Sequence, residues 1–170
     1  MMVLYVLIFL AKIVEVSLMT LRTVLITRGE KVVGSIIGFF EVIIWLYLVS
    51  TVLVGISEDP IKMVVYALGF SVGNYVGSFL EEKLAIGLLT ISIVASANDA
   101  IMIAEKLRKD NLGVTLVEAE GMNEKKKMIV VHVKRKRKKE VIKLIEDTNT
   151  KAVISIADTK TVYGGYGIKK

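Results

Sequence analysis

The sequence of 170 residues contains no cysteine, no glutamine, one proline and one histidine. Without cysteine, the chain can form neither a disulfide framework nor a thiolate metal site. The single histidine, His132, provides no cluster of the kind that binds zinc. A phosphate-loop glycine pattern and a recognisable pair of catalytic carboxylates are also missing. We therefore expect no enzyme activity, no metal and no cofactor.

Apolar residues, in contrast, are abundant. They make up 54% of the chain, and the mean hydropathy of +0.60 is too high for an ordinary soluble domain of this size. The charge is unevenly divided, because residues 1–80 carry five basic and five acidic side chains, so the whole net charge of +6 belongs to the second half. This division predicts a membrane domain over residues 1–82 and a cytoplasmic domain over residues 83–170.

Three segments are long and apolar enough to cross a bilayer, which requires roughly 20 helical residues for a core of about 30 Å. They cover residues 2–26, 32–56 and 61–80. The first connection is basic, with Arg22, Arg28 and Lys31, whereas the second contains Glu58 and Asp59. Because basic loops stay in the cytoplasm, we expect a multi-pass cell-membrane protein with its N-terminus outside and its C-terminal domain in the cytoplasm.

Small residues follow one face of the third segment, where Gly69, Gly73 and Gly77 recur at every fourth position. In lipid, such residues allow helix backbones to approach closely, within one chain or between copies. The alternative is a pore or ligand groove lined by backbone. Asn74 lies beside this face and is a candidate for polar coordination.

Four charged residues fall within the apolar segments, where an ionised group is costly unless it has a partner or water. Lys12 and Glu15 are three residues apart and share a helical face, Arg22 lies two turns further on, and Glu41 is near the middle of the second segment. One interpretation is a network of ion pairs that fixes the helices. The other is an ion or proton path, which predicts a small oligomeric channel or transporter.

The second half alternates between strand and helix patterns, with strands rich in β-branched residues and helices with apolar residues at helical spacing. The order is strand, helix, hairpin, helix, strand, which is that of a ferredoxin-like βαββαβ domain with two helices on one side of an antiparallel sheet. The expected strands are 88–96, 113–121, 128–136 and 151–158, and the expected helices are 99–110, capped by Asn98, and 138–148. The hairpin turn is expected at 122–127.

The densest charge is the basic run 134–139, where the third strand meets the second helix. Lys134, Arg135, Lys136 and Arg137 are candidates for binding anions: lipid headgroups, a small phosphorylated ligand or nucleic acid. Nucleic acid is the least favoured, because no aromatic residue interleaves with the run to stack on bases.

Two further features of this half bear on ligand binding. Gly164 and Gly165, near the C-terminus, could wrap a ligand or simply lead the chain away from the last strand. The sheet should leave one face open, carrying Thr90, Ser92, Val130, His132 and Ser155. We interpret His132 as a surface or interface residue.

Several motifs resemble the uncharacterised protein family 0316 of prokaryotic membrane proteins. They are "TLRTVLITRG" at 20–29, "GFFEVIIW" at 38–45, "YALGFSVGNYVGSFLEEKLAIG" at 66–87, and "GVT" with a closing "D…GGY". Arg22, Arg28, Glu41, Asn74, Glu81 and Glu82 fall within them, without assigned roles. The C-terminal part resembles the domain of unknown function 2179, which also ends YitT-type membrane proteins and is similar in shape to regulatory modules of the PII and ACT kind.

The resemblance implies a multi-pass membrane protein, and such regulatory modules often bind small ligands and form oligomers. We therefore expect a homo-oligomer in the lipid bilayer whose cytoplasmic domain senses a small ligand, or drives assembly, and couples to the membrane helices. Glu81 and Glu82 mark the junction of the two parts. For the basic run, anionic lipid headgroups are the first candidate partner, a small phosphorylated ligand is the second, and nucleic acid is not expected.

Overall fold

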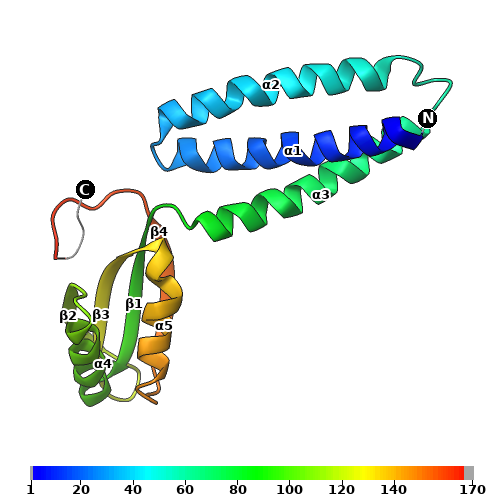
Figure 1. Ribbon diagram of the computed structural model, residues 1–170. Coiled ribbons are helices and arrows are strands. Elements are labelled where there is room, and N and C mark those ends of the chain that lie inside the picture. The colour runs from blue at the N-terminus through cyan, green and yellow to red at the C-terminus, as the bar shows by residue number, and fades with distance from the viewer. Residues whose placement is uncertain (1, 167–170) are drawn as a thin grey trace. The chain divides into compact units, whose positions relative to one another are not determined.

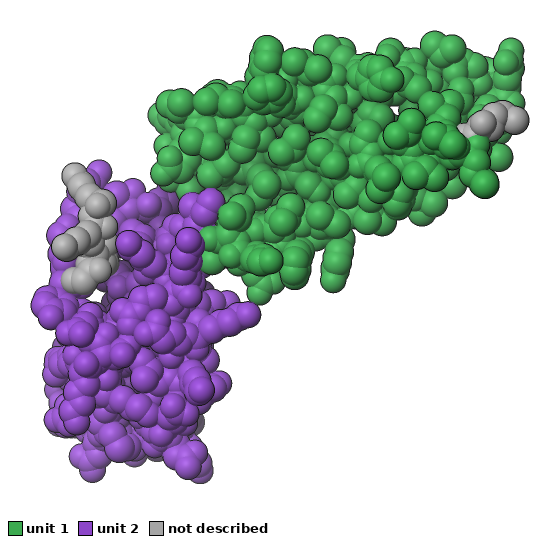
Figure 2. Space-filling view, viewed as in Figure 1, with its two compact units in different colours: residues 1–85 green, residues 86–170 purple. Residues whose placement is uncertain are grey.

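The computed structural model describes residues 2–166. Contacts divide the chain into two compact units, residues 1–85 and 86–170 (Figure 2). The first unit contains three long helices and the second contains a four-stranded sheet with two helices (Figure 1). This is the expected architecture of an all-helical membrane part followed by an α+β domain.

The first unit consists of α1 (Met2–Thr27), α2 (Lys31–Leu53) and α3 (Ile61–Leu84). At about 1.5 Å per residue, helices of 26, 23 and 24 residues exceed a hydrocarbon core of about 30 Å. All three are long and apolar enough to cross a membrane. α2 ends three residues before the predicted position, because the chain turns at Gly55 with a φ of 68°. α3 continues past residue 80 and includes both Glu81 and Glu82.

α1 lies between the other two helices and packs against both, whereas α2 and α3 make few contacts with each other (Figure 1). Large apolar side chains consequently point outward from all three helices. Val3, Phe39 and Tyr75, for example, are 74%, 65% and 77% exposed. An aqueous solvent would penalise this surface, whereas lipid tails would not.

The contact between α1 and α3 depends on the predicted glycine face. Gly69, Gly73 and Gly77 are the buried residues of α3. A Cβ atom added to Gly73 would lie 2.7 Å from the Cβ of Val16, and one added to Gly77 would lie 2.6 Å from the Oγ1 of Thr20. Both distances are shorter than carbon and oxygen atoms tolerate, so the helix spacing requires glycine at these positions.

A second close contact, which the sequence analysis missed, joins α1 to α2. A Cβ added to Gly34 would lie 2.7 Å from the Cγ1 of Ile26, and one added to Gly38 would lie 2.9 Å from the Cδ of Arg22. The two glycines have the same four-residue spacing as the glycines of α3. This spacing is the signal from which the contact could have been predicted. Both α2 and α3 thus approach α1 through small residues.

The second unit has the order β1, α4, β2, β3, α5, β4, with a short 3-10 turn (Arg135–Arg137) before α5. The sheet order is β2-β3-β1-β4 and the neighbouring strands run antiparallel. This is the predicted ferredoxin-like βαββαβ topology. The strands are β1 (Leu88–Ser96), β2 (Val114–Glu120), β3 (Lys125–Lys134) and β4 (Val153–Thr159), and the helices are α4 (Ala97–Lys109) and α5 (Lys138–Glu146).

The two helices cover one face of the sheet. Along β1 the odd-numbered residues, such as Ile91 and Ile93, are fully buried, while the even-numbered residues between them are partly exposed. Ile103 of α4 and Val141 of α5 pack into the same core. The opposite face therefore carries Thr90, Ser92, Val130, His132 and Ser155, as the alternation predicts.

Two local predictions were wrong. The side chain of Ser96, not Asn98, caps α4, because its hydroxyl accepts a hydrogen bond from the backbone N–H of Asp99 at 3.2 Å. The hairpin turn is also shorter than expected, since the backbone N–H of Gly121 donates to the carbonyl of Glu124 and β3 begins at Lys125. The lysines assigned to the turn thus pair with β2, where Lys127 lies opposite Glu118.

The glycine contact predicts a specific loss of stability. We expect Gly73→Ala to destabilise the helical unit by about 1–3 kcal/mol, because the added methyl group must push α1 and α3 apart. The matched control is Ser78→Ala, which changes an exposed residue of the same helix. Thermal unfolding in detergent provides the comparison, and equal midpoints for the two variants would contradict the close contact.

Candidate functional site

A hollow of about 260 Å³ lies between the open face of the sheet and the segment that follows β4. β4 is at one edge of the sheet, yet residue 166 lies beside Gly113, next to β2 at the opposite edge. The segment 160–166 therefore crosses the width of the sheet. The hollow is lined by Gly113, Val114, Thr115, Val130, His132, Val162, Gly164, Gly165 and Tyr166.

Glycine permits this crossing at two places. Gly164 and Gly165 have φ values of 76° and 108°, a conformation that favours glycine because it has no Cβ atom. At Gly113, an added Cβ would lie 3.0 Å from the carbonyl oxygen of Tyr166. Gly164 and Gly165, proposed from the sequence as ligand-wrapping residues, thus lie in the wall of a hollow.

His132 lines the hollow from the open face of β3. Its Nδ1 is 2.8 Å from the hydroxyl of Thr90 on β1, and that hydroxyl is 2.6 Å from the hydroxyl of Thr159 at the end of β4. A chain of polar contacts thus runs from β3 across β1 to β4. Thr90 and His132 lie opposite each other in the pairing of β1 with β3. The sequence alone does not fix this register, so the contact could not be predicted from it.

A second hollow, of about 210 Å³, shares Gly113, His132 and Tyr166 with the first. Its remaining lining comes from the end of α4 and from the basic run. These residues are Asn111, Leu112, Val133, Lys134 and Arg137. Because they share three lining residues, the two hollows are adjacent, and we refer to them together as the cleft, with a glycine-rich end and a basic end.

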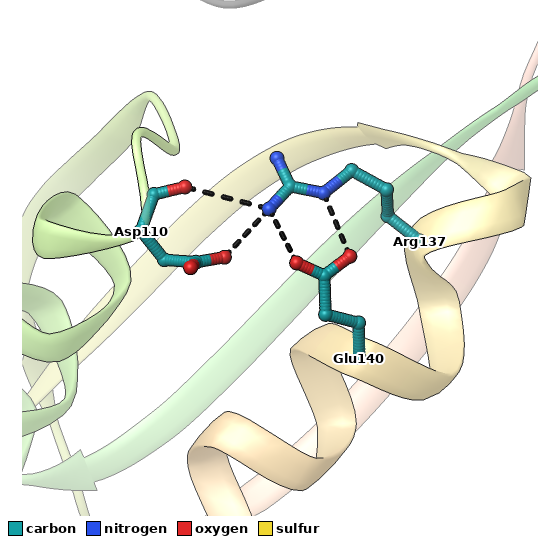
Figure 3. Close-up of polar contacts among 3 residues, drawn as sticks. All are labelled: Asp110, Arg137 and Glu140. Atoms are coloured by element: carbon teal, nitrogen blue, oxygen red, sulfur yellow. Dashed lines mark hydrogen bonds and ion pairs between the residues drawn. The ribbon is translucent and has the colours of Figure 1, made fainter.

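Arg137, at the basic end, is held by two carboxylates (Figure 3). Its Nη2 donates to Asp110 Oδ2 at 2.6 Å and to Glu140 Oε1 at 2.7 Å, and its Nε donates to Glu140 Oε2 at 2.9 Å. The hydrogen bond with Glu140, together with the attraction of both carboxylates, raises the pKa of Arg137. The same hydrogen bond lowers the pKa of Glu140. This cluster joins the end of α4 to the start of α5.

The four candidate anion-binding cations are therefore not equivalent. Arg137 has its two carboxylate partners, and the Nη1 of Arg135 lies 3.5 Å from Asp158 Oδ1. Within residues 2–166, no ion pair involves Lys134 or Lys136, and both side chains are exposed. Of these two, Lys134 lines the cleft. Lys134 is the cation of the run that faces the cleft without a carboxylate.

The intramembrane charges form two separate pairs. The ammonium of Lys12 lies 2.5 Å from Glu15 Oε2 and donates to the hydroxyl of Tyr66 at 2.8 Å, so a charged pair on α1 is joined to α3. The ammonium also lies 4.2 Å from the centre of the Tyr66 ring, a cation–π distance. Both charged side chains are almost completely buried, at 3% and 4% exposure.

The other intramembrane pair joins α1 to α2. Arg22 Nε lies 2.7 Å from Glu41 Oε2, and the Glu41 side chain is only 8% exposed. The glycine contact at Gly38 positions the stem of Arg22 for this pair. Glu15 and Glu41 thus belong to different pairs, and the structure does not bring them together.

At the end of α3, the two junction glutamates differ. Glu81 is half-buried and lies 3.4 Å from Arg28 Nη2, whereas Glu82 is exposed. The remaining polar candidate, Asn74, is half-buried beside the glycine face, and its amide has no hydrogen bond to any residue of the described range 2–166. These residues lie in the first unit and do not contribute to the cleft.

The Arg137 cluster predicts a dependence of stability on pH. A carboxyl whose pKa is lowered on folding stabilises the folded chain above its unfolded pKa, and this contribution disappears as the pH falls through the folded value. We expect Glu140→Gln to cost less than about 1 kcal/mol at neutral pH, because the Glu140 side chain is 48% exposed. The difference from wild type should shrink below the ordinary carboxyl pKa of about 4.3.

Thermal unfolding of the full chain in detergent, followed by circular dichroism, measures this difference. Glu146→Gln is the matched control, since Glu146 is an exposed carboxylate at the other end of α5. A difference between Glu140→Gln and wild type that persists unchanged in acid would show that the Arg137 contacts do not cause it.

Two family models match parts of the chain. "Domain of unknown function (DUF5698)" matches residues 20–78, which include most of the helical unit. "Uncharacterized protein conserved in bacteria (DUF2179)" matches residues 112–164, which include β2 to β4 and most of the crossing segment. The DUF2179 match therefore contains His132, Lys134 and Gly164, three residues of the cleft.

Solved structures similar to part of this chain include a functionally unknown protein from Pediococcus pentosaceus, with a TM-score of 0.44 and 11% identity over 47% of this chain and 99% of that chain. A DUF2179 protein from Eubacterium ventriosum has a TM-score of 0.33 and 22% identity over 41% of this chain and 97% of that chain.

Relatives over nearly the whole length are closer. A UPF0316 protein from Clostridium botulinum is 63% identical over 98% of both chains. A UPF0316 protein from Acetivibrio thermocellus is 38% identical over 96% of this chain and 79% of its own length. The chain thus belongs to the UPF0316 family, an uncharacterised family that joins three candidate membrane helices to a DUF2179 domain.

Proposed function

We propose that this protein is a membrane sensor whose second unit binds a small ligand in the cleft beneath residues 160–166. The observation that carries the proposal is the cleft itself, in which the crossing segment, the open sheet face and the basic run meet around His132. Concave sites with a few convergent polar groups are the usual places for small ligands. The exposed apolar surface of the three helices supports placement of the first unit in the bilayer.

The chain connection supports transmission from the cleft to the helices. Only Ala85, Ile86 and Gly87 separate the end of α3 from the start of β1. The backbone N–H of Arg135 donates to the carbonyl of Gly87 at 2.9 Å, so the connection is tied to the basic run. Thr90, which contacts His132, follows three residues later. A ligand that favours one arrangement of these residues would shift the populations of the helical unit.

The loop charges also support an orientation with the second unit in the cytoplasm. Arg28 lies in the connection between α1 and α2 and Lys31 is the first residue of α2, whereas the connection between α2 and α3 contains Glu58 and Asp59. With an odd number of spans, the C-terminal unit lies on the same side as the basic connection. In this proposal the expected homo-oligomer forms through the lipid-facing surfaces of the helices.

We further propose that Glu15 and Glu41 stabilise the helical unit and do not conduct ions. Each carboxylate already has a cation within 2.7 Å, at Lys12 and Arg22, respectively. Removing one partner of such a buried pair leaves an uncompensated charge, which typically costs about 3–5 kcal/mol. This favours a role in holding α1 against its neighbours over the alternative of a channel or transporter.

Sensing is tested by a thermal-shift screen of the full chain in detergent against nucleotides, sugar phosphates, amino acids and carboxylic acids. We expect at least one compound to raise the unfolding midpoint of wild type and not that of Gly113→Val, whose side chain would enter the cleft beside Tyr166. Val117→Ala, on the open face of β2 but outside the cleft, is the matched control and should respond like wild type. If no compound shifts wild type, or if Gly113→Val responds equally, the proposed site is wrong.

The same chain offers a test of coupling, since it has no native cysteine. Spin labels at Thr27→Cys and Glu82→Cys, both exposed, report the separation of the C-terminal ends of α1 and α3, beside the contact of Arg28 with Glu81. We expect a compound found in the screen to change this separation, and expect no change when Gly113→Val is added. An unchanged separation with bound compound would contradict coupling to the helices.

Conduction is tested by ion flux into liposomes containing wild type or Glu41→Gln. We expect equal flux from the two proteins, together with a lower unfolding midpoint for Glu41→Gln, because Arg22 loses its partner. Ser71→Ala, an exposed change on α3, controls for reconstitution. Flux that depends on the Glu41 carboxylate would favour the channel instead.

A further inference from the structure

The two ends of the cleft differ in chemistry, and the difference defines the class of ligand. The first end is lined by three glycines, three valines, Thr115 and Tyr166, in addition to His132, and contains no charged residue. The second end contains Lys134, Arg137 and Asn111, whose side chains supply mostly hydrogen-bond donors. A ligand that fills both ends therefore needs an uncharged organic part and a group rich in acceptors.

Donors remain available at the basic end. Lys134 has no carboxylate partner within the described chain, 2–166. Arg137 uses Nη2 and Nε for Asp110 and Glu140, and its other terminal nitrogen, Nη1, makes no contact with these residues (Figure 3). The carboxylates orient the guanidinium, so that Nη1 is the nitrogen left to donate to a ligand.

His132 lines both ends of the cleft, and one of its nitrogens is already used. Nδ1 is held by the hydroxyl of Thr90, which is in turn held by Thr159. The contact fixes the orientation of the ring. It leaves the opposite nitrogen, Nε2, for a ligand. Thr90 therefore acts as a positioning residue for His132.

We propose that the cleft binds a soluble phosphate ester, with its phosphate held by Lys134 and the Nε2 of His132 and its organic part beneath residues 162–166. A phosphate group presents three charged acceptor oxygens, which match the donors that the ammonium of Lys134, the guanidinium of Arg137 and the imidazole of His132 can supply along this end of the cleft. A carboxylate would leave part of this donor set unused. This assignment rests on the proposed sensing function and specifies its ligand.

Isothermal titration of the full chain in detergent, with inorganic phosphate and a set of phosphate monoesters as probes, tests the assignment. We expect phosphate esters to bind wild type, and expect Lys134→Met to weaken binding by about tenfold or more, the usual effect of losing a charged hydrogen bond. Lys138→Met, which removes an exposed cation of the same basic run outside the cleft lining, should bind like wild type. Equal weakening in both variants would indicate a diffuse charge effect and overturn the site.

Two substitutions of His132 separate its nitrogens. Asparagine places an amide near the position of Nδ1 and nothing at Nε2, whereas glutamine places an amide near Nε2. We expect His132→Asn to bind phosphate esters about tenfold more weakly, and His132→Gln to restore most of the affinity. Thr90→Val should also weaken binding, without affecting thermal stability as strongly as a core substitution. If His132→Asn binds as wild type does, the role of Nε2 is wrong.

The source of the phosphate is tested with nanodiscs of phosphatidylcholine alone or with phosphatidylglycerol. If anionic lipid binds through Lys134 and soluble phosphate esters do not, the ligand is a headgroup and the assignment falls. If carboxylic acids or uncharged compounds bind in a manner sensitive to Gly113→Val while phosphate esters do not, the ligand class is wrong although the sensing function stands.

Discussion

The close approach of α3 to α1 is the constraint on which the helical unit depends. Three glycines of α3 admit the backbone of α1 and the first side-chain atoms of Lys12, Val16 and Thr20 at distances that no larger residue allows. Because lipid provides no hydrophobic drive for helices to associate, this packing must supply much of the attraction. The spacing also sets the reach of the polar contacts. Lys12 bonds to Tyr66, and Arg28 to Glu81, only because the two axes are close.

α1 distributes its charged residues between its two neighbours. Lys12 of α1 and Arg28, which directly follows the helix, contact α3, while Arg22 of α1 contacts Glu41 of α2. Each buried charge has a partner of opposite sign, which offsets the cost of removing it from water. α1 therefore orients α2 and α3 separately, and those two helices do not need to contact one another extensively. The three helices form a layer about α1 and not a closed bundle.

Much of this structure was predictable, because each element has a period that the sequence displays. Apolar runs of about 20 residues predicted the spans, and alternation along β1 predicted which residues face α4 and α5. Helices α2 and α3 both carry glycines at a four-residue spacing where they contact α1, although only those of α3 were recognised from the sequence. The period of the sequence was sufficient to predict a helix or strand and its buried face, because these depend on one element alone.

The cleft could not be predicted in the same way, because it depends on contacts between distant segments. Tyr166 reaches Gly113 only because the chain crosses the sheet after β4, and Arg137 meets Asp110 only because α4 ends beside the start of α5. The basic run gave no sign that its members differ. Which cation is neutralised depends on where Asp110, Glu140 and Asp158 lie in the fold.

The glycine contact limits the motions open to α3. Turning this helix about its own axis would bring a neighbouring side chain such as Phe70 or Asn74 against α1, where only a hydrogen atom fits at present. Tilting α3 about the contact brings no larger side chain into this space, although it would stretch the contacts of Lys12 with Tyr66 and of Arg28 with Glu81. The glycine contact thus restricts rotation of α3 about its axis more strongly than a change in its tilt relative to α1.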